Sequence, residues 1–155
     1  MLLKSFIKKK IFRPIMKREI DHSKQGKKNK VAGSRFELKI RNLLEKDGWI
    51  IDKWTNNVDL EERKVVKAKR KFNPFKRIMT IGTGFPDFIS IKNIGGGYYD
   101  VVGIEVKSNG YLDQEEKAKC RFLLEEKIFS KIIIVKKGKK KGVIEFYNFR
   151  EKYPQ

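Results

Sequence analysis

Two carboxylates and one lysine stand at places in the sequence where folding could bring them together. Asp87 opens the apolar run PDFISI, whereas Glu105 and Lys107 lie at the end of the run YYDVVGIEVK. The glycine-rich segment between the runs predicts a hairpin, so the start of the first strand lies beside the end of the second. Asp87 and Glu105 would then meet at one edge of a sheet, with Glu105 and Lys107 on the same face.

Two carboxylates that are close together and partly desolvated repel each other unless a cation lies between them. A few hard oxygen ligands, here Asp87, Glu105 and the backbone carbonyl of Val106, suit Mg²⁺, for which Mn²⁺ would substitute. Such an ion polarises a phosphodiester and lowers the pKa of water, while Lys107 would position or activate that water or stabilise the transition-state charge. A structural interpretation stays open, in which Asp87 forms a turn after Pro86 and the other two side chains are simply exposed.

The composition points to a polyanionic partner. The chain has 155 residues, and 38 Lys and Arg against 19 Asp and Glu give a net charge of +19. A charge of this size is typical of proteins that bind nucleic acid or an anionic membrane. The single cysteine excludes an intrachain disulfide and fits a cytoplasmic location, and the single histidine excludes a multi-histidine metal site.

Hydrophobic periodicity predicts a mixed α/β fold, a small central sheet flanked by two helices. Ser34 and Glu37 form the pattern of a capping box at the start of the first helix, and Gly48 is a stop signal. Residues 1–30 are expected to be a flexible basic arm, and residues 31–155 the folded domain. The expected elements are a helix over 34–48, a strand over 49–54, an irregular connection over 55–80, a hairpin over 86–106, a helix over 112–129, a strand over 131–137 and an edge strand over 143–149.

Two basic segments, residues 1–30 and 63–77, are predicted to contact the phosphates of DNA. A membrane-surface helix is the alternative for the first, because apolar residues recur between Leu3 and Ile15. Trp54 is either a base-stacking residue or part of the core, and the lysines at 139–141 are expected to form a solvated turn. The predicted phosphate contacts are Lys27, Lys28, Lys30, Arg35, Lys67, Lys69, Arg70, Lys71, Lys76 and Arg77.

The motif PD at 86–87 followed by EVK at 105–107 resembles that of the PD-(D/E)xK nuclease superfamily. The order of elements is similar to the restriction-endonuclease-like αβββαβ core of that superfamily. The stretch GSRFELKIRNLLEKDGW, from Gly33 to Trp49, resembles the opening of archaeal-type Holliday-junction resolvases. The resemblance implies that Glu37 completes the metal site, a role that can coexist with helix capping, and that Gln114 faces the site from the second helix.

The sequence therefore predicts a Mg²⁺-dependent DNA endonuclease. Two alternatives stay open. The chain could be a Holliday-junction resolvase that acts as a homodimer on opposed strands, or a nucleic-acid-binding module that has the fold without the reaction.

Overall fold

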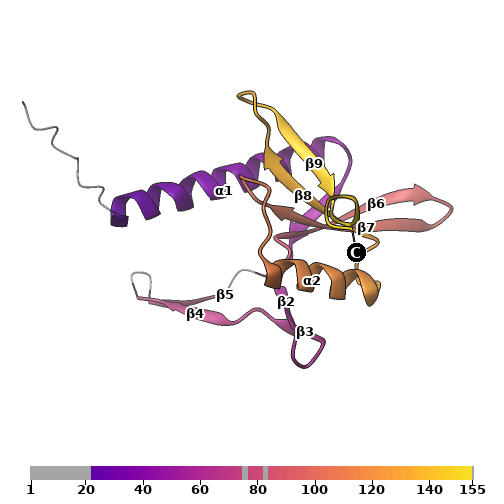
Figure 1. Cartoon of the computed structure of the whole chain (residues 1–155), viewed down its shortest axis with the longest axis horizontal. Coiled ribbons are helices and arrows are strands. Elements are labelled where there is room, and N and C mark those ends of the chain that lie inside the picture. The colour runs from indigo at the N-terminus through magenta and orange to yellow at the C-terminus, as the bar shows by residue number, and fades with distance from the viewer. Residues whose placement is uncertain (1–21, 75–76, 82–83, 155) are drawn as a thin grey trace, which may run out of the picture.

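A five-stranded mixed sheet lies at the centre of the protein, in strand order β1-β6-β7-β8-β9. The computed structural model describes residues 22–74, 77–81 and 84–154 (Figure 1). All neighbouring strands are antiparallel except β7 and β8, which are parallel and are connected through α2. The strands of this sheet are β1 (Ile50–Lys53), β6 (Phe88–Gly95), β7 (Tyr98–Val106), β8 (Lys131–Lys137) and β9 (Ile144–Asn148). The two long helices are α1 (His22–Lys46) and α2 (Gln114–Glu125).

The two faces of the sheet bury two separate apolar clusters, one under each long helix. On β7, Val102 and Ile104 belong to the cluster that contains Phe36 and Ile40 of α1. The intervening positions of β7 point toward α2, whose inward side chains pack on a second cluster with Ile132 and Ile134 of β8. The prediction of a mixed α/β sheet flanked by two helices is thus confirmed at this level.

The β6–β7 hairpin fixes the position of the predicted carboxylates. Gly96 and Gly97 form its turn with φ of +61° and +80°, a left-handed conformation that favours glycine. The last pair of the ladder toward the open end is Phe88 with Ile104. Asp87 is therefore opposite Glu105, one step beyond this pair.

The first helix is longer than the sequence predicts. It begins at His22, so residues 22–33 are helical, and the prediction of a flexible arm up to residue 30 and a capped start at Ser34 is wrong for this part. The exposed residues 25–32 have no apolar face to bury, which removes the periodic signal of a helix. Residues 1–21, with the predicted membrane-surface segment, lie outside the described residues. No helix in the described part has the length and apolar character of a membrane span.

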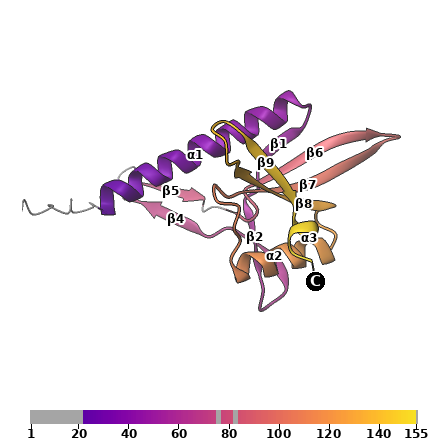
Figure 2. The same cartoon turned by 45° about the horizontal axis from the view of Figure 1, so that its top comes forward.

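Two short hairpins replace the irregular connection predicted for residues 55–80. The first pairs β2 (Asn56–Asp59) with β3 (Lys64–Lys67), and the second pairs β4 (Arg70–Asn73) with β5 (Ile78–Ile81). Strands of only four residues are too short to give an alternation that can be recognised. The β4–β5 hairpin and the N-terminal half of α1 project on one side, and the β6–β7 hairpin projects on the other (Figure 2). A short helix, α3 (Phe149–Lys152), follows β9 and was not predicted.

Gly84 lies against the backbone that precedes the site, which gives a testable prediction for the fold. A Cβ atom at this position would overlap the carbonyl oxygen of Trp54 and press on that of Asn56. Because backbone must move, we expect Gly84→Ala to lower the free energy of unfolding by roughly 2–4 kcal/mol in a urea titration. Gly33→Ala is the control, since a Cβ at this helical position meets nothing within 4 Å and should stabilise the protein by roughly 0.5–1 kcal/mol. Equal stabilities of the two variants would contradict the close approach.

Candidate active site

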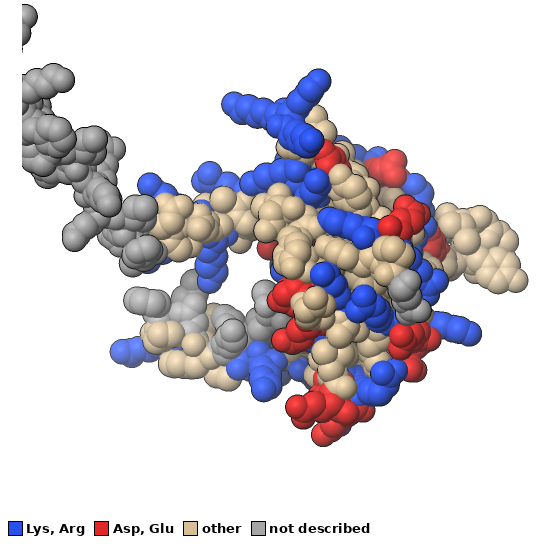
Figure 3. Space-filling view, viewed as in Figure 1, with Lys and Arg blue, Asp and Glu red and all other residues tan. Residues whose placement is uncertain are grey.

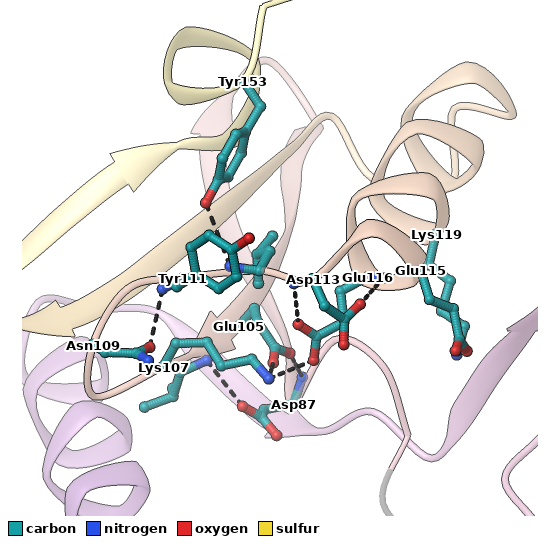
Figure 4. Close-up of polar contacts among 12 residues, drawn as sticks. Asp87, Glu105, Lys107, Asn109, Tyr111, Asp113, Glu115, Glu116, Lys119 and Tyr153 are labelled. Carbon is teal, nitrogen blue, oxygen red and sulfur yellow. Dashed lines mark hydrogen bonds and ion pairs between the residues drawn. The ribbon is translucent and has the colours of Figure 1, made fainter.

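Asp87 and Glu105 meet at the edge of the sheet, where each accepts a hydrogen bond from the backbone beside the other. The amide of Asp87 donates to Oε2 of Glu105 at 3.2 Å, and the amide of Val106 donates to Oδ2 of Asp87 at 2.9 Å (Figure 4). The amide of Trp54 donates to the carbonyl of Asp87 at 3.1 Å and fixes its backbone from the β1 side. The predicted convergence of the two carboxylates is confirmed.

Burial makes this carboxylate pair unusual. Glu105 is only 4% exposed, and it is the one buried charged residue in the described part of the chain. Burial, together with the charge of Asp87, raises the pKa of Glu105 well above its ordinary value. Burial also raises the pKa of Asp87 to about 6, although the Val106 amide opposes the shift. Two carboxylates that resist ionisation side by side form a site that a cation would stabilise.

Lys107 provides one positive charge next to the pair. Its Nζ lies 3.6 Å from Oε1 of Glu105 and donates a hydrogen bond to the carboxylate of Glu116 (Figure 4). Burial alone would lower the pKa of Lys107, but the Glu116 hydrogen bond and the charge of Glu105 outweigh it and raise the pKa. The side chain is therefore held as an ammonium group, with its position defined by two carboxylates.

Glu116 is the site residue that the sequence prediction missed. It is the third residue of α2, and its Oε2 accepts from the amide of Asp113 at 3.0 Å while Asp113 accepts from the amide of Glu116 at 2.8 Å. The pattern Asp-x-x-Glu at 113–116 is readable as a capping box, but nothing in it indicates the contact with Lys107. Gln114, predicted to face the site, is exposed at the start of α2 and makes no hydrogen bond to a described site residue.

Glu37 comes from α1 and pairs with a lysine that the sequence did not single out. Its Oε2 lies 2.7 Å from Nζ of Lys53 on β1. Because α1 starts at His22, Glu37 is in the middle of the helix, and the capping-box interpretation is wrong. Its charge contributes to the raised pKa of Asp87, so it lies in the same electrostatic environment. Within the described residues, however, no three Asp, Glu, Cys or His side chains are placed to hold one ion, and Glu37 does not complete such a set.

Most of the predicted nucleic-acid contacts are on the surface, where Figure 3 shows basic side chains along α1. Trp54 is the exception: its ring packs edge-on against Phe129 at 5.2 Å, within the cluster beneath α2. That position contradicts base stacking and supports the core interpretation. The side chain of Lys71 on β4 is not described, and Lys76 lies outside the described residues. Exposed are Lys27, Lys28, Lys30 and Arg35 on α1, Lys67 on β3, and Lys69, Arg70 and Arg77 around β4 and β5.

The role of Glu116 can be tested by Glu116→Gln. Glutamine keeps the oxygen that caps α2, so the fold should be retained, but it removes the charge that holds Lys107. We expect the pKa of Lys107, followed by NMR of labelled lysine side chains, to fall. If the site is catalytic, turnover should drop roughly 10- to 100-fold. Lys119 on the same helix, paired with Glu115 at 2.6 Å, serves as the internal reference signal. An unchanged Lys107 signal would contradict a positioning role for Glu116.

No protein-family model matches this sequence, and the comparisons with curated proteins and with solved structures found no significant match. Function must therefore be inferred from the site itself. The site combines a buried and a half-buried carboxylate, Glu105 and Asp87, with an ammonium group that is fixed beside them. This chemistry suits a hard divalent cation next to an anionic substrate.

Proposed function

We propose that the chain is a metal-dependent nuclease that hydrolyses phosphodiester bonds in DNA. The observation that carries the proposal is the pairing of buried Glu105 with half-buried Asp87, each hydrogen-bonded to the backbone beside the other, with Lys107 adjacent. The net charge of +19 supports a polyanionic substrate. The chain order of α1, β1, β6, β7, α2 and β8 supports the resemblance to the PD-(D/E)xK superfamily, with the β2–β5 hairpins as an insertion.

The residues of the site fit a Mg²⁺ ion. Asp87 and Glu105 would hold it, with the backbone carbonyl of Val106 as the additional oxygen ligand. Among the described residues, each carboxylate has one oxygen that accepts no backbone hydrogen bond, Oδ1 of Asp87 and Oε1 of Glu105. The bound ion supplies Lewis-acid polarisation of the phosphate and a water of lowered pKa.

The chain's own residues would orient the substrate and stabilise charge. Glu116 holds the ammonium group of Lys107 next to Glu105, where it can donate hydrogen bonds to a phosphate oxygen or to the attacking water. Lys53, whose side chain is 51% exposed and is held by Glu37, provides a second cation, whose charge acts on Asp87. The burial of Glu105 removes its carboxylate from bulk water, which strengthens its electrostatic interactions with Lys107 and with a bound cation.

A cleavage assay tests the proposal. Purified protein is incubated with plasmid and with linear oligonucleotides in Mg²⁺, in Mn²⁺ or in EDTA, and we expect cutting only with a divalent ion. Salt-sensitive binding without cutting in any metal would instead favour the non-catalytic module. A four-way junction and a linear duplex of the same sequence are compared in parallel, because preferential cutting of the junction would identify a resolvase. Cutting in EDTA would overturn the proposal.

A further inference from the structure

A groove between α1 and the turn that joins β8 to β9 has an unusual charge. Its volume is about 580 Å³, and its lining contains six basic residues and no acidic residue. Three of the basic residues occupy the turn itself, which extends from the body of the protein at the top of Figure 3. The basic residues are Arg35, Lys39, Lys137, Lys139, Lys140 and Lys141.

The carboxylate beside the turn, that of Glu145, pairs with a lysine outside the groove. Among the described residues, none of the six forms an ion pair, whereas Lys136, one position before Lys137, pairs with Glu145 at 3.0 Å. Nζ of Lys137 instead lies 5.2 Å from the centre of the Phe36 ring. Like charges that gather without counter-charges create a positive potential, which a polyanion would relieve.

A second groove of the protein shows that this arrangement is not general. The groove beside β2, β3 and α2 has the basic residues Lys67, Lys69 and Lys119, but Asp59, Glu61 and Glu115 also line it. Its charges balance locally, so it offers no continuous attraction for phosphates. Of these two grooves, the one between α1 and the β8–β9 turn is lined by charges of one sign, and the other is not.

We propose that the groove between α1 and the β8–β9 turn binds the phosphodiester backbone of DNA that flanks the cleaved bond. Five of its six cations are lysines, which act as point charges and follow a backbone without reading bases. Phe36 is 6% exposed and lies beneath Lys137, so it offers no face on which a base could stack. On β8, Lys137 lies two residues beyond Val135, which pairs with Val106, the residue after Glu105, so this strand links the groove to the edge of the sheet that carries the carboxylate pair. The choice of DNA as partner rests on the proposed function.

The test measures binding without cleavage. A labelled duplex is titrated with the full chain in EDTA at several salt concentrations, for wild type and for the triple variant K139Q/K140Q/K141Q. The turn is exposed and its lysines form no described ion pair, so the variant should fold. The matched control K46Q/K127Q/R150Q removes the same charge from exposed residues outside the groove.

We expect the groove variant to bind roughly 10- to 100-fold more weakly at moderate salt, and the slope of log K against log salt to fall by about 1 for each lost phosphate contact. The control should change binding by less than about threefold. Equal weakening of DNA binding in the groove variant and the control would overturn the proposal. It would also be overturned if the groove variant lost binding to phosphatidylserine vesicles but bound DNA as tightly as wild type. Because binding is measured in EDTA and cleavage in Mg²⁺, a failure of the nuclease proposal appears separately, as binding that depends on the groove without metal-dependent cleavage.

Discussion

Glu105→Gln is expected to abolish metal-dependent DNA cleavage while leaving the fold intact. Glutamine has the same shape and retains an oxygen that can accept the amide of Asp87, a hydrogen bond of 3.2 Å in the wild type. It removes the buried charge that would hold the ion and that lies 3.6 Å from Nζ of Lys107. A metal supplies several kcal/mol of transition-state stabilisation, so the cleavage rate should fall at least roughly 1000-fold. The measurement is the initial rate of plasmid nicking in Mg²⁺.

The control for this variant is Glu115→Gln. Glu115 lies in the first turn of α2, next to the site residue Glu116. Its own side chain is 67% exposed and pairs with Lys119 rather than with a residue of the site. Its rate should remain within about twofold of wild type, because Glu115 pairs with Lys119 and forms no ion pair with a described residue of the site. If Glu105→Gln cuts DNA as fast as Glu115→Gln, the carboxylate pair is not the catalytic centre.

The placement of Asp87 and Glu105 could be predicted because it depends on local rules. Consecutive glycines form the turn of the β6–β7 hairpin, and the period of two along each strand then fixes which side chains meet. The same periodicity placed Val106 on the opposite face from Glu105, where it packs against the cluster beneath α1. These inferences need no knowledge of distant parts of the chain.

What the sequence did not reveal depends on contacts between distant segments. Lys53 reaches Glu37 only because α1 packs beside β1, and Glu116 reaches Lys107 only because the α2 N-terminus lies over the end of β7. The helical residues 22–33 lack an apolar face, so periodicity could not detect them. Trp54 shows a third limit: either role was compatible with its position in the sequence, and tertiary packing against Phe129 decided for the core.

Asp87→Asn is expected to stabilise the metal-free protein at alkaline pH. The pKa of Asp87 is raised from 3.8 to about 6, mainly by burial, so the folded state binds a proton that the unfolded state has already released between these pH values. The contribution of Asp87 to the free energy of unfolding is therefore favourable below about pH 4 and is lost as pH rises through about 6. The difference between the two pKa values corresponds to about 3 kcal/mol. Asparagine cannot ionise, and its side-chain oxygen can still accept the Val106 amide.

Urea unfolding in EDTA at about pH 4.5 and about pH 8 measures this effect. The free energy of unfolding of the variant should exceed that of wild type by up to about 3 kcal/mol at the higher pH. At the lower pH, the difference between the two free energies should be smaller. Asp52→Asn, at a side chain that is 79% exposed, should show no such gain. Added Mg²⁺ should stabilise wild type at the higher pH more than Asp87→Asn, since ligand binding to the folded state raises its stability. A carboxylate that serves to bind a cation destabilises the folded protein until the cation is present. If Asp87→Asn were instead less stable than wild type in EDTA at the higher pH, Asp87 would be a structural carboxylate whose charge the fold requires.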